Sequence, residues 1–231
     1  AKAFRLFDAS NQIAFLFAVL LLPIFSNMIK NNKPIVHIVK LAFSLLFTIS
    51  VTASVSSFFY SQEIMTLLYP GDNIDSTRIF SILMFGFIAV SGIYVFGTLL
   101  TANGSLKQLN IIAGFAIVLN LLINFILIPK MAALGSAYAS LSAQCISVIM
   151  QAIIVQRIFR FKLNFQYLGS LVAFAVIIVI AAYFSKQFAF DWYINLILLL
   201  VFAFVLSSIL RLFSIKGFIR IIRERESELP E

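Results

Sequence analysis

The chain has 231 residues, of which 62% are hydrophobic and only 11% are charged. A soluble domain has about a quarter charged residues, and its core cannot absorb this much apolar surface. The formal net charge of +8 would suit a nucleic-acid binder. However, the basic residues fall in short segments between apolar runs, so we expect no nucleic-acid partner. The composition predicts an all-α, polytopic membrane protein.

Seven apolar runs are long enough to cross the hydrocarbon core as helices, which takes roughly 20 residues each. In chain order they cover residues 9–29, 38–60, 79–102, 109–128, 133–155, 167–185 and 192–212. Charged and turn-forming residues separate them, for example at Lys30 to Pro34 and at Pro129-Lys130. We therefore expect about seven transmembrane helices, with the longest loop at residues 61–78.

The distribution of Lys and Arg predicts the orientation, because cytoplasmic loops carry an excess of them. The side that holds the C-terminus collects twelve of these residues, and the opposite side collects five. This places the C-terminus in the cytoplasm. Residues 213–231 combine apolar and basic residues at helical spacing, which predicts a cytoplasmic basic amphipathic tail. Anchoring to anionic lipid is the favoured role for this tail, and a regulatory or partner-binding role is the alternative.

No group of residues in the sequence suggests catalysis. There is no P-loop Gly-Lys motif, and no pair of carboxylates lies inside an apolar run. The single histidine, His37, and the single cysteine, Cys145, have no second ligand at a metal-binding spacing. We expect neither an enzyme nor a bound metal or cofactor.

Uncharged polar residues inside the apolar runs are the candidates for function, because polar groups in hydrocarbon need partners. Asn120 and Asn124 lie one helical turn apart in the fourth run, and Gln144 lies in the fifth. These amides are predicted either to bond across helices or to line a cavity. Small residues from Gly135 to Ser147 form a ridge that favours close helix packing.

The order of these features resembles one family of transporters. Two Asn residues four apart run into Ile128-Pro129, a short turn, and a small-residue helix that begins Ala133-Leu134-Gly135. Leu21-Leu22-Pro23, Leu68 to Gly71 and Thr101 to Gly104 fit the same pattern. The chain is similar to polysaccharide flippases of the multidrug/oligosaccharidyl-lipid/polysaccharide exporter superfamily, nearest the O-antigen and capsule types.

The resemblance implies the C-terminal half of a fourteen-helix transporter with two lobes and a terminal helix pair. Residues 1–155 would form part of the second lobe with five transmembrane helices, residues 156–212 the terminal pair, and residues 213–231 the tail. The first lobe and the opening helix of the second lobe would be absent. We therefore expect a fragment whose partner is the missing N-terminal lobe.

The function implied by the resemblance is flipping of an undecaprenyl-diphosphate-linked oligosaccharide across the bacterial cytoplasmic membrane by alternating access, for surface polysaccharide synthesis. Arg5 matches the family's basic residue at the mouth of the cavity; an anchor at the outer leaflet is the alternative for it. Arg5, Asn120, Asn124 and Gln144 make up the expected substrate-binding set. The terminal pair would hold the isoprenoid tail. Membrane lipids and polysaccharide-assembly enzymes are further expected partners.

Two other functions remain open. A cation-coupled multidrug exporter of the same superfamily usually needs buried carboxylates. Here the acidic residues lie outside the predicted spans or at their ends: Asp8, Glu63, Asp72, Asp75 and Asp191. The other possibility is a non-transporting membrane scaffold for polysaccharide assembly.

Overall fold

The computed structural model describes residues 2–71, 74–161 and 164–212. Within these ranges all regular structure is helical: α1 (Lys2–Lys30), α2 (Val36–Phe59), α3 (Ser61–Leu68), α4 (Ile74–Ala102), α5 (Leu106–Met131), α6 (Ala133–Phe159), α7 (Phe165–Ser185) and α8 (Trp192–Ile209). Seven of these helices, all except α3, are long and apolar enough to cross a membrane. The predicted all-α, polytopic fold is confirmed. The predicted basic tail, residues 213–231, lies outside the described residues.

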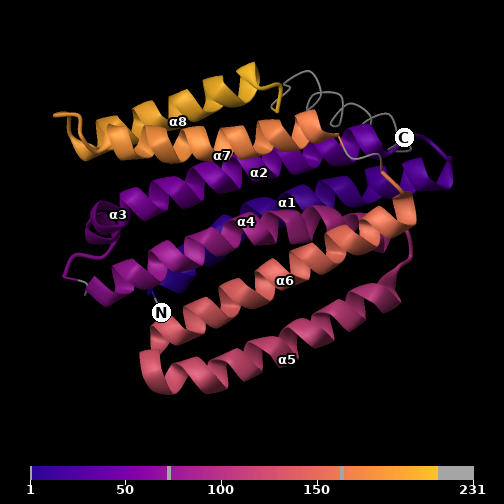
Figure 1. Cartoon of the computed structure of the whole chain (residues 1–231), viewed down its shortest axis with the longest axis horizontal. Helices are drawn as coiled ribbons and strands as arrows, with labels where there is room; N and C mark the ends of the chain where they lie inside the picture. The colour runs from indigo at the N-terminus through magenta and orange to yellow at the C-terminus, as the bar shows by residue number, and fades with distance from the viewer. Residues whose placement is uncertain (1, 72–73, 162–163, 213–231) are drawn as a thin grey trace, which may run out of the picture.

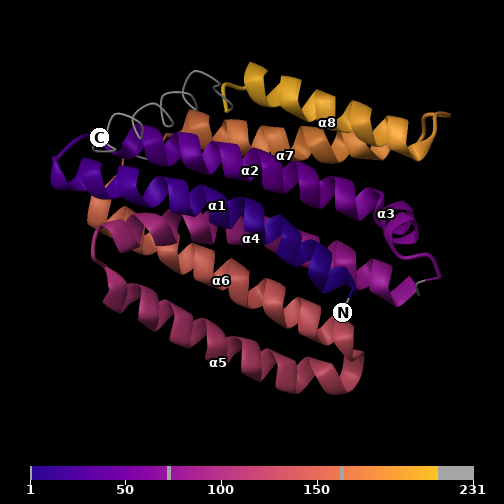
Figure 2. The same ribbon diagram turned by 180° about the vertical axis from the view of Figure 1, so that it is seen from behind.

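Successive long helices run in opposite directions through the bundle (Figure 1). The start of α1, the α3 segment, the α5–α6 turn and the α7–α8 loop gather at one end, which we call the α3 end. The α1–α2, α4–α5 and α6–α7 connections gather at the other end, as the view from behind also shows (Figure 2). The connections at the two ends of the bundle are therefore the same two groups of segments whose Lys and Arg residues were counted to predict the orientation.

Helix α4 occupies the centre of the bundle, since α1, α2 and α6 all pack against it. Helix α5 packs mainly on α6 at one edge, and α7 and α8 pack on α2 at the other edge (Figure 1). Helix α5 is therefore the least covered span, and only 6% of its most apolar stretch is buried.

Glycines on α4 leave room for one stripe of side chains on α6. Three glycines of α4 each face a side chain of this stripe: Gly86 faces Gln144, Gly92 faces Val148, and Gly97 faces Gln151. A Cβ atom at Gly92 would lie 2.5 Å from Cγ2 of Val148, which is closer than two carbons can approach. The glycines thus set the register between α4 and α6, as small residues do in membrane helix pairs.

Hydroxyl groups join α2 to α4 inside the bundle. Ser50 and Ser91 hydroxyls are 3.2 Å apart, and Ser54 donates to the backbone oxygen of Met84. Hydrogen bonds between membrane helices contribute about 0.6 kcal/mol each on average. The Ser- and Thr-rich stretch of α2 therefore serves helix packing, a role that the sequence analysis did not assign to it.

Several helix boundaries differ from those predicted. Helix α1 begins at Lys2 rather than near residue 9. Hydropathy marks only the apolar part of a helix, and the helix itself can extend beyond it through polar residues. Part of the predicted loop at residues 61–78 forms α3. Helix α5 continues through Pro129 to Met131, and one residue, Ala132 with a φ of 48°, leads into α6. Pro129 has no backbone N–H to donate to the helix. Proline is tolerated within membrane helices where other groups bond the backbone oxygen that it leaves free.

Candidate functional site

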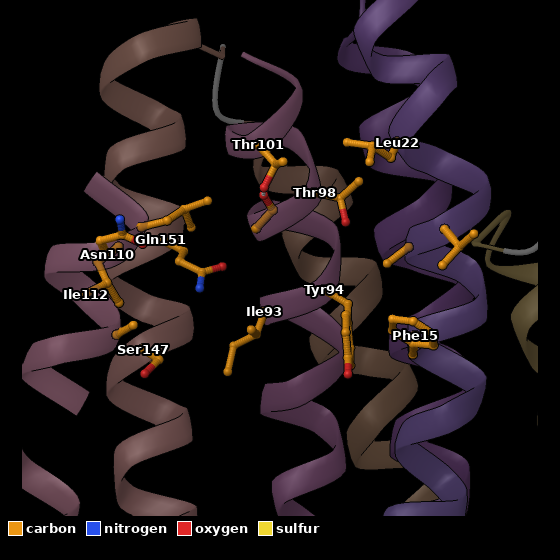
Figure 3. A pocket seen from close by; sticks show the side chains of 15 residues that line it. Phe15, Leu22, Ile93, Tyr94, Thr98, Thr101, Asn110, Ile112, Ser147 and Gln151 are labelled. Carbon is orange, nitrogen blue, oxygen red and sulfur yellow. Dashed lines mark hydrogen bonds between the residues drawn. The ribbon is translucent and has the colours of Figure 1, made fainter. Parts of the chain in front are cut away.

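A cleft of about 520 Å³ opens between α1, α4, α5 and α6 (Figure 3). Its walls are mostly apolar, with Phe15 and Leu22 of α1 and Tyr94 of α4 among them. The polar groups that line it are four hydroxyls, including that of Tyr94, and two amides; the other five residues are Thr98, Thr101, Ser147, Asn110 and Gln151. We call this space the interhelical cleft.

Gln151 is the most informative polar group in the interhelical cleft. It is only 6% exposed, and its Oε1 atom has no hydrogen-bond partner among the described residues. In Figure 3 its side chain points into the space between the helices. An unpartnered buried acceptor destabilises a protein, more so where no water is available. Gln151 is therefore placed to accept a hydrogen bond from a group that enters the cleft.

Two of the hydroxyl groups are already bonded to their own helices. Thr101 donates to the backbone oxygen of Gly97 at 2.8 Å, and Ser147 donates to that of Ala143 at 2.8 Å. No charged side chain is among the residues that line the cleft. The cleft thus offers amides and hydroxyls to an uncharged group.

The structure separates the four residues of the predicted substrate-binding set. Asn124 donates to Oδ1 of Asn120 at 2.8 Å, so the two amides of α5 pair with each other. Gln144 of α6 lies against Gly86 of α4, and its Oε1 has no partner among the described residues.

Arg5 is exposed on α1, near the α3 end. None of the four predicted residues lines the interhelical cleft. Their role in substrate binding stays a prediction.

The sequence analysis missed Gln151, although a signal for it was present. Gln144 and Gln151 are seven residues apart, so they lie on the same stripe of α6. Following the stripe from Gln144 for two more turns would have found the second amide. Asn110 had no such signal, because its position in the cleft depends on how α5 packs against α6.

The terminal pair of helices borders two smaller apolar recesses. One, of about 280 Å³, lies between α7 and α8 and includes Phe184, Phe188 and Phe202. The other, of about 250 Å³, lies between α2 and α8 and includes Ile49, Leu200 and Phe204. Both open between apolar helices, in surroundings suited to hydrocarbon.

Comparison with known proteins gives the family. None of the curated proteins matches the chain significantly. The family model described as "Lipid II flippase MurJ" matches residues 12–203, which include most of α1 and of α8 and everything between them. This family lies within the expected exporter superfamily, whereas the O-antigen or capsule type is not the one matched.

The match also confirms two expectations of a more general kind. Members of this family are transporters, so the protein is not an enzyme. Together with the seven apolar helices, the match makes it a multi-pass protein of the cytoplasmic membrane. The chain belongs to the lipid II flippase MurJ family.

Proposed function

We propose that this chain takes part in flipping lipid II, a polyprenyl-diphosphate-linked saccharide, across the cytoplasmic membrane, with its C-terminus on the cytoplasmic side. The family match over residues 12–203 is the observation that carries this proposal. A diphosphate and its sugars cannot cross hydrocarbon unaided, because their polar groups would lose water without replacement. Lipid II takes the place of the O-antigen or capsule oligosaccharide as first candidate, because the matching family is named for it.

We infer that the interhelical cleft receives one more transmembrane helix of the same transporter, the opening helix of this lobe. Three features support this. The walls of the cleft come from four helices, α5 is barely covered, and Gln151 lacks a hydrogen-bond donor. A helix with a Ser, Thr or Asn on its inner face would fill the cleft and supply that donor.

The apolar recesses beside α8 are the proposed place for the isoprenoid tail. Their linings of Phe, Leu and Ile side chains offer a flexible hydrocarbon chain contacts like those of the lipid around it. The diphosphate would meet Arg5 at the exposed start of α1. A guanidinium suits this role because it can form two parallel hydrogen bonds to a phosphate group.

Accessibility to water tests the proposed roles of Arg5, Asn120, Asn124 and Gln144. Single cysteines at these positions, in a Cys145→Ser background, are expected to react with a water-soluble thiol reagent in the intact transporter. Phe125→Cys is the matched control, because Phe125 is 85% exposed on the apolar surface beside Asn124. It is expected to stay unreactive in lipid. Four unreactive positions would refute a shared aqueous cavity.

Complementation tests the function itself. The gene that encodes this chain, expressed in cells depleted of their own lipid II flippase, is expected to restore growth. Arg5→Ala is expected to lose this rescue at equal membrane levels, and Arg5→Lys to keep part of it. Rescue only in cells that lack an O-antigen flippase would restore the oligosaccharide interpretation. If the gene rescues neither strain but the cells gain drug resistance, drug export is supported. If it rescues neither strain and gives no drug resistance, a membrane scaffold is supported.

A further inference from the structure

The α3 end of the bundle carries another recess, separate from the interhelical cleft and different in chemistry. It has a volume of about 530 Å³ and is lined by Gln62, Glu63, Thr66 and Leu67 of α3 and by Trp192 of α8. This size falls within the roughly 300–1,000 Å³ typical of small-molecule sites. An amide, a carboxylate and a hydroxyl thus share one space with an indole ring. We call it the α3–α8 recess.

Contacts around the α3–α8 recess hold its two sides together. Lys186 forms an ion pair with Oε1 of Glu63, and its ammonium lies 4.8 Å from the centroid of the Tyr60 ring. The Tyr60 hydroxyl hydrogen-bonds to Ser185, which donates to the backbone oxygen of Asn195 at 3.4 Å. These bonds connect α3 to the end of α7 and the first turn of α8, so the recess is built by the fold.

The second carboxylate oxygen of Glu63 is unused within the described residues. Oε1 is engaged by Lys186, whereas Oε2 is shielded from solvent and has no hydrogen-bond partner among the described residues. An ionised carboxylate can only accept hydrogen bonds, so Oε2 needs a donor. The Glu63 side chain as a whole is 26% exposed, so a small rotation of the carboxylate would bring Oε2 to the recess, where the hydroxyl group of a ligand would provide the donor.

The charges around the α3–α8 recess indicate which ligand fits. Lys186 neutralises Glu63, so the pair leaves no net charge for an ammonium ligand. Its ammonium is also occupied by that carboxylate and the Tyr60 ring, which disfavours a phosphate ligand. An indole beside an amide, a hydroxyl and an acceptor oxygen fits a pyranose ring instead. The apolar C–H face of the sugar can lie on the aromatic ring, and its hydroxyls can bond to the polar side chains.

We propose that the α3–α8 recess binds an uncharged sugar unit, with the ring against Trp192 and a hydroxyl donating to Glu63. This end of the bundle is the outer end in the proposed orientation, where a flipped saccharide emerges. The recess would then hold sugars of the lipid-linked substrate after transfer. That last step rests on the proposed function, whereas binding of a free sugar does not.

Fluorescence tests the proposal directly, because Trp192 is the single tryptophan of the chain. The purified chain in lipid nanodiscs is titrated with chitobiose, an uncharged N-acetylated disaccharide, and a saturable change in emission is expected. Gln62→Ala and Thr66→Ala, both at exposed positions of α3, are each expected to raise the Kd about two- to tenfold through loss of one hydrogen bond. Gln187→Ala is the matched control, since Gln187 is exposed in the α7–α8 loop but does not line the recess.

Several outcomes would overturn the proposal. One is a Trp192 emission that does not change saturably with chitobiose. The others are a Kd that stays the same in both α3 variants, and a change in emission with glycerol as large as that with chitobiose. A stronger response to glucosamine or to glucose phosphate would assign the recess to a cation or an anion instead. The measurement involves no transport, so absent sugar binding with intact complementation refutes only the recess. Sugar binding with failed complementation refutes only the flippase function.

Discussion

Gly86 and Gly135 are both buried, but an added methyl group would meet different obstacles at the two positions. At Gly86 the obstacle is the amide end of the Gln144 side chain, which can rotate away. At Gly135 it is the backbone oxygen of Leu127, 2.6 Å from the ideal Cβ position. A backbone atom can move only if the whole α5–α6 turn moves with it, so close packing at Gly135 is the stricter constraint.

We therefore expect Gly135→Ala to lower the free energy of unfolding by about 1–3 kcal/mol, the usual range for overpacking. Gly86→Ala is expected to cost less. Gly114→Ala, where nothing lies within 4 Å, is the control and is expected to gain up to about 1 kcal/mol from helix propensity. Thermal unfolding in detergent micelles measures all three. Equal losses at the three positions would contradict the packing of α6 on α5.

The unpartnered amide of Gln151 gives a prediction whose sign depends on the context. In the isolated chain, Gln151→Leu is expected to raise stability by about 1 kcal/mol, because it removes a buried acceptor that lacks a partner. In the complete transporter the same change is expected to lower stability and transport, because the proposed helix loses its acceptor. Gln108→Leu, at an exposed position of α5, is the control. A loss of stability in the isolated chain would show that the amide already has a partner there.

At the scale of helices, the terminal pair is attached to the rest of the bundle at both ends. Near the start of α7, the Tyr167 hydroxyl lies 3.0 Å from that of Ser44 and donates to the backbone oxygen of Lys40 at 3.2 Å. Near its end, Ser185 bonds to Tyr60. Along α2 the two attachments are about 24 Å apart, at about 1.5 Å per residue. Apolar surface alone would let α7 slide along α2, and these bonds fix its position.

Loss of either attachment is expected to be modest and independent of the other. Tyr60→Phe and Tyr167→Phe are each expected to lower the free energy of unfolding by about 0.5–1.5 kcal/mol. The double variant is expected to show the sum within about 0.5 kcal/mol, because the sites share no partners. Tyr183→Phe, on a side chain that is 57% exposed, serves as the control in the same unfolding assay. A clearly non-additive result would mean that the pair docks as one cooperative unit.

The sequence predicted helices well but not the elements between them. Hydropathy identified the seven long spans, because a membrane helix satisfies its own backbone and so depends on its local composition. It missed α3, whose eight residues mix apolar and polar side chains. It also ended the fourth span before Pro129, because a proline is a strong local signal for the end of a helix, whereas α5 continues through it to Met131.

At the scale of the whole molecule, the two ends of the bundle are expected to face opposite sides of the membrane. Gln187→Cys at the α3 end and Gln108→Cys at the other end are both exposed positions. In a Cys145→Ser background, an impermeant thiol reagent is expected to label Gln187→Cys in intact cells and Gln108→Cys only after permeabilisation. The Cys145→Ser protein alone should stay unlabelled. The reverse pattern would place the C-terminus outside and refute the predicted orientation.

The sequence by itself determined the membrane class, the number and order of the spans, and the transporter superfamily. These follow from local hydropathy and from motifs read along one stretch of chain. Only the tertiary structure decided which polar groups meet. The interhelical cleft joins residues of four helices, and the α3–α8 recess joins Glu63 to Trp192 across most of the chain. Helices of similar hydropathy can pack in many ways, and their order comes from a few glycines and hydrogen bonds whose partners lie far apart in sequence.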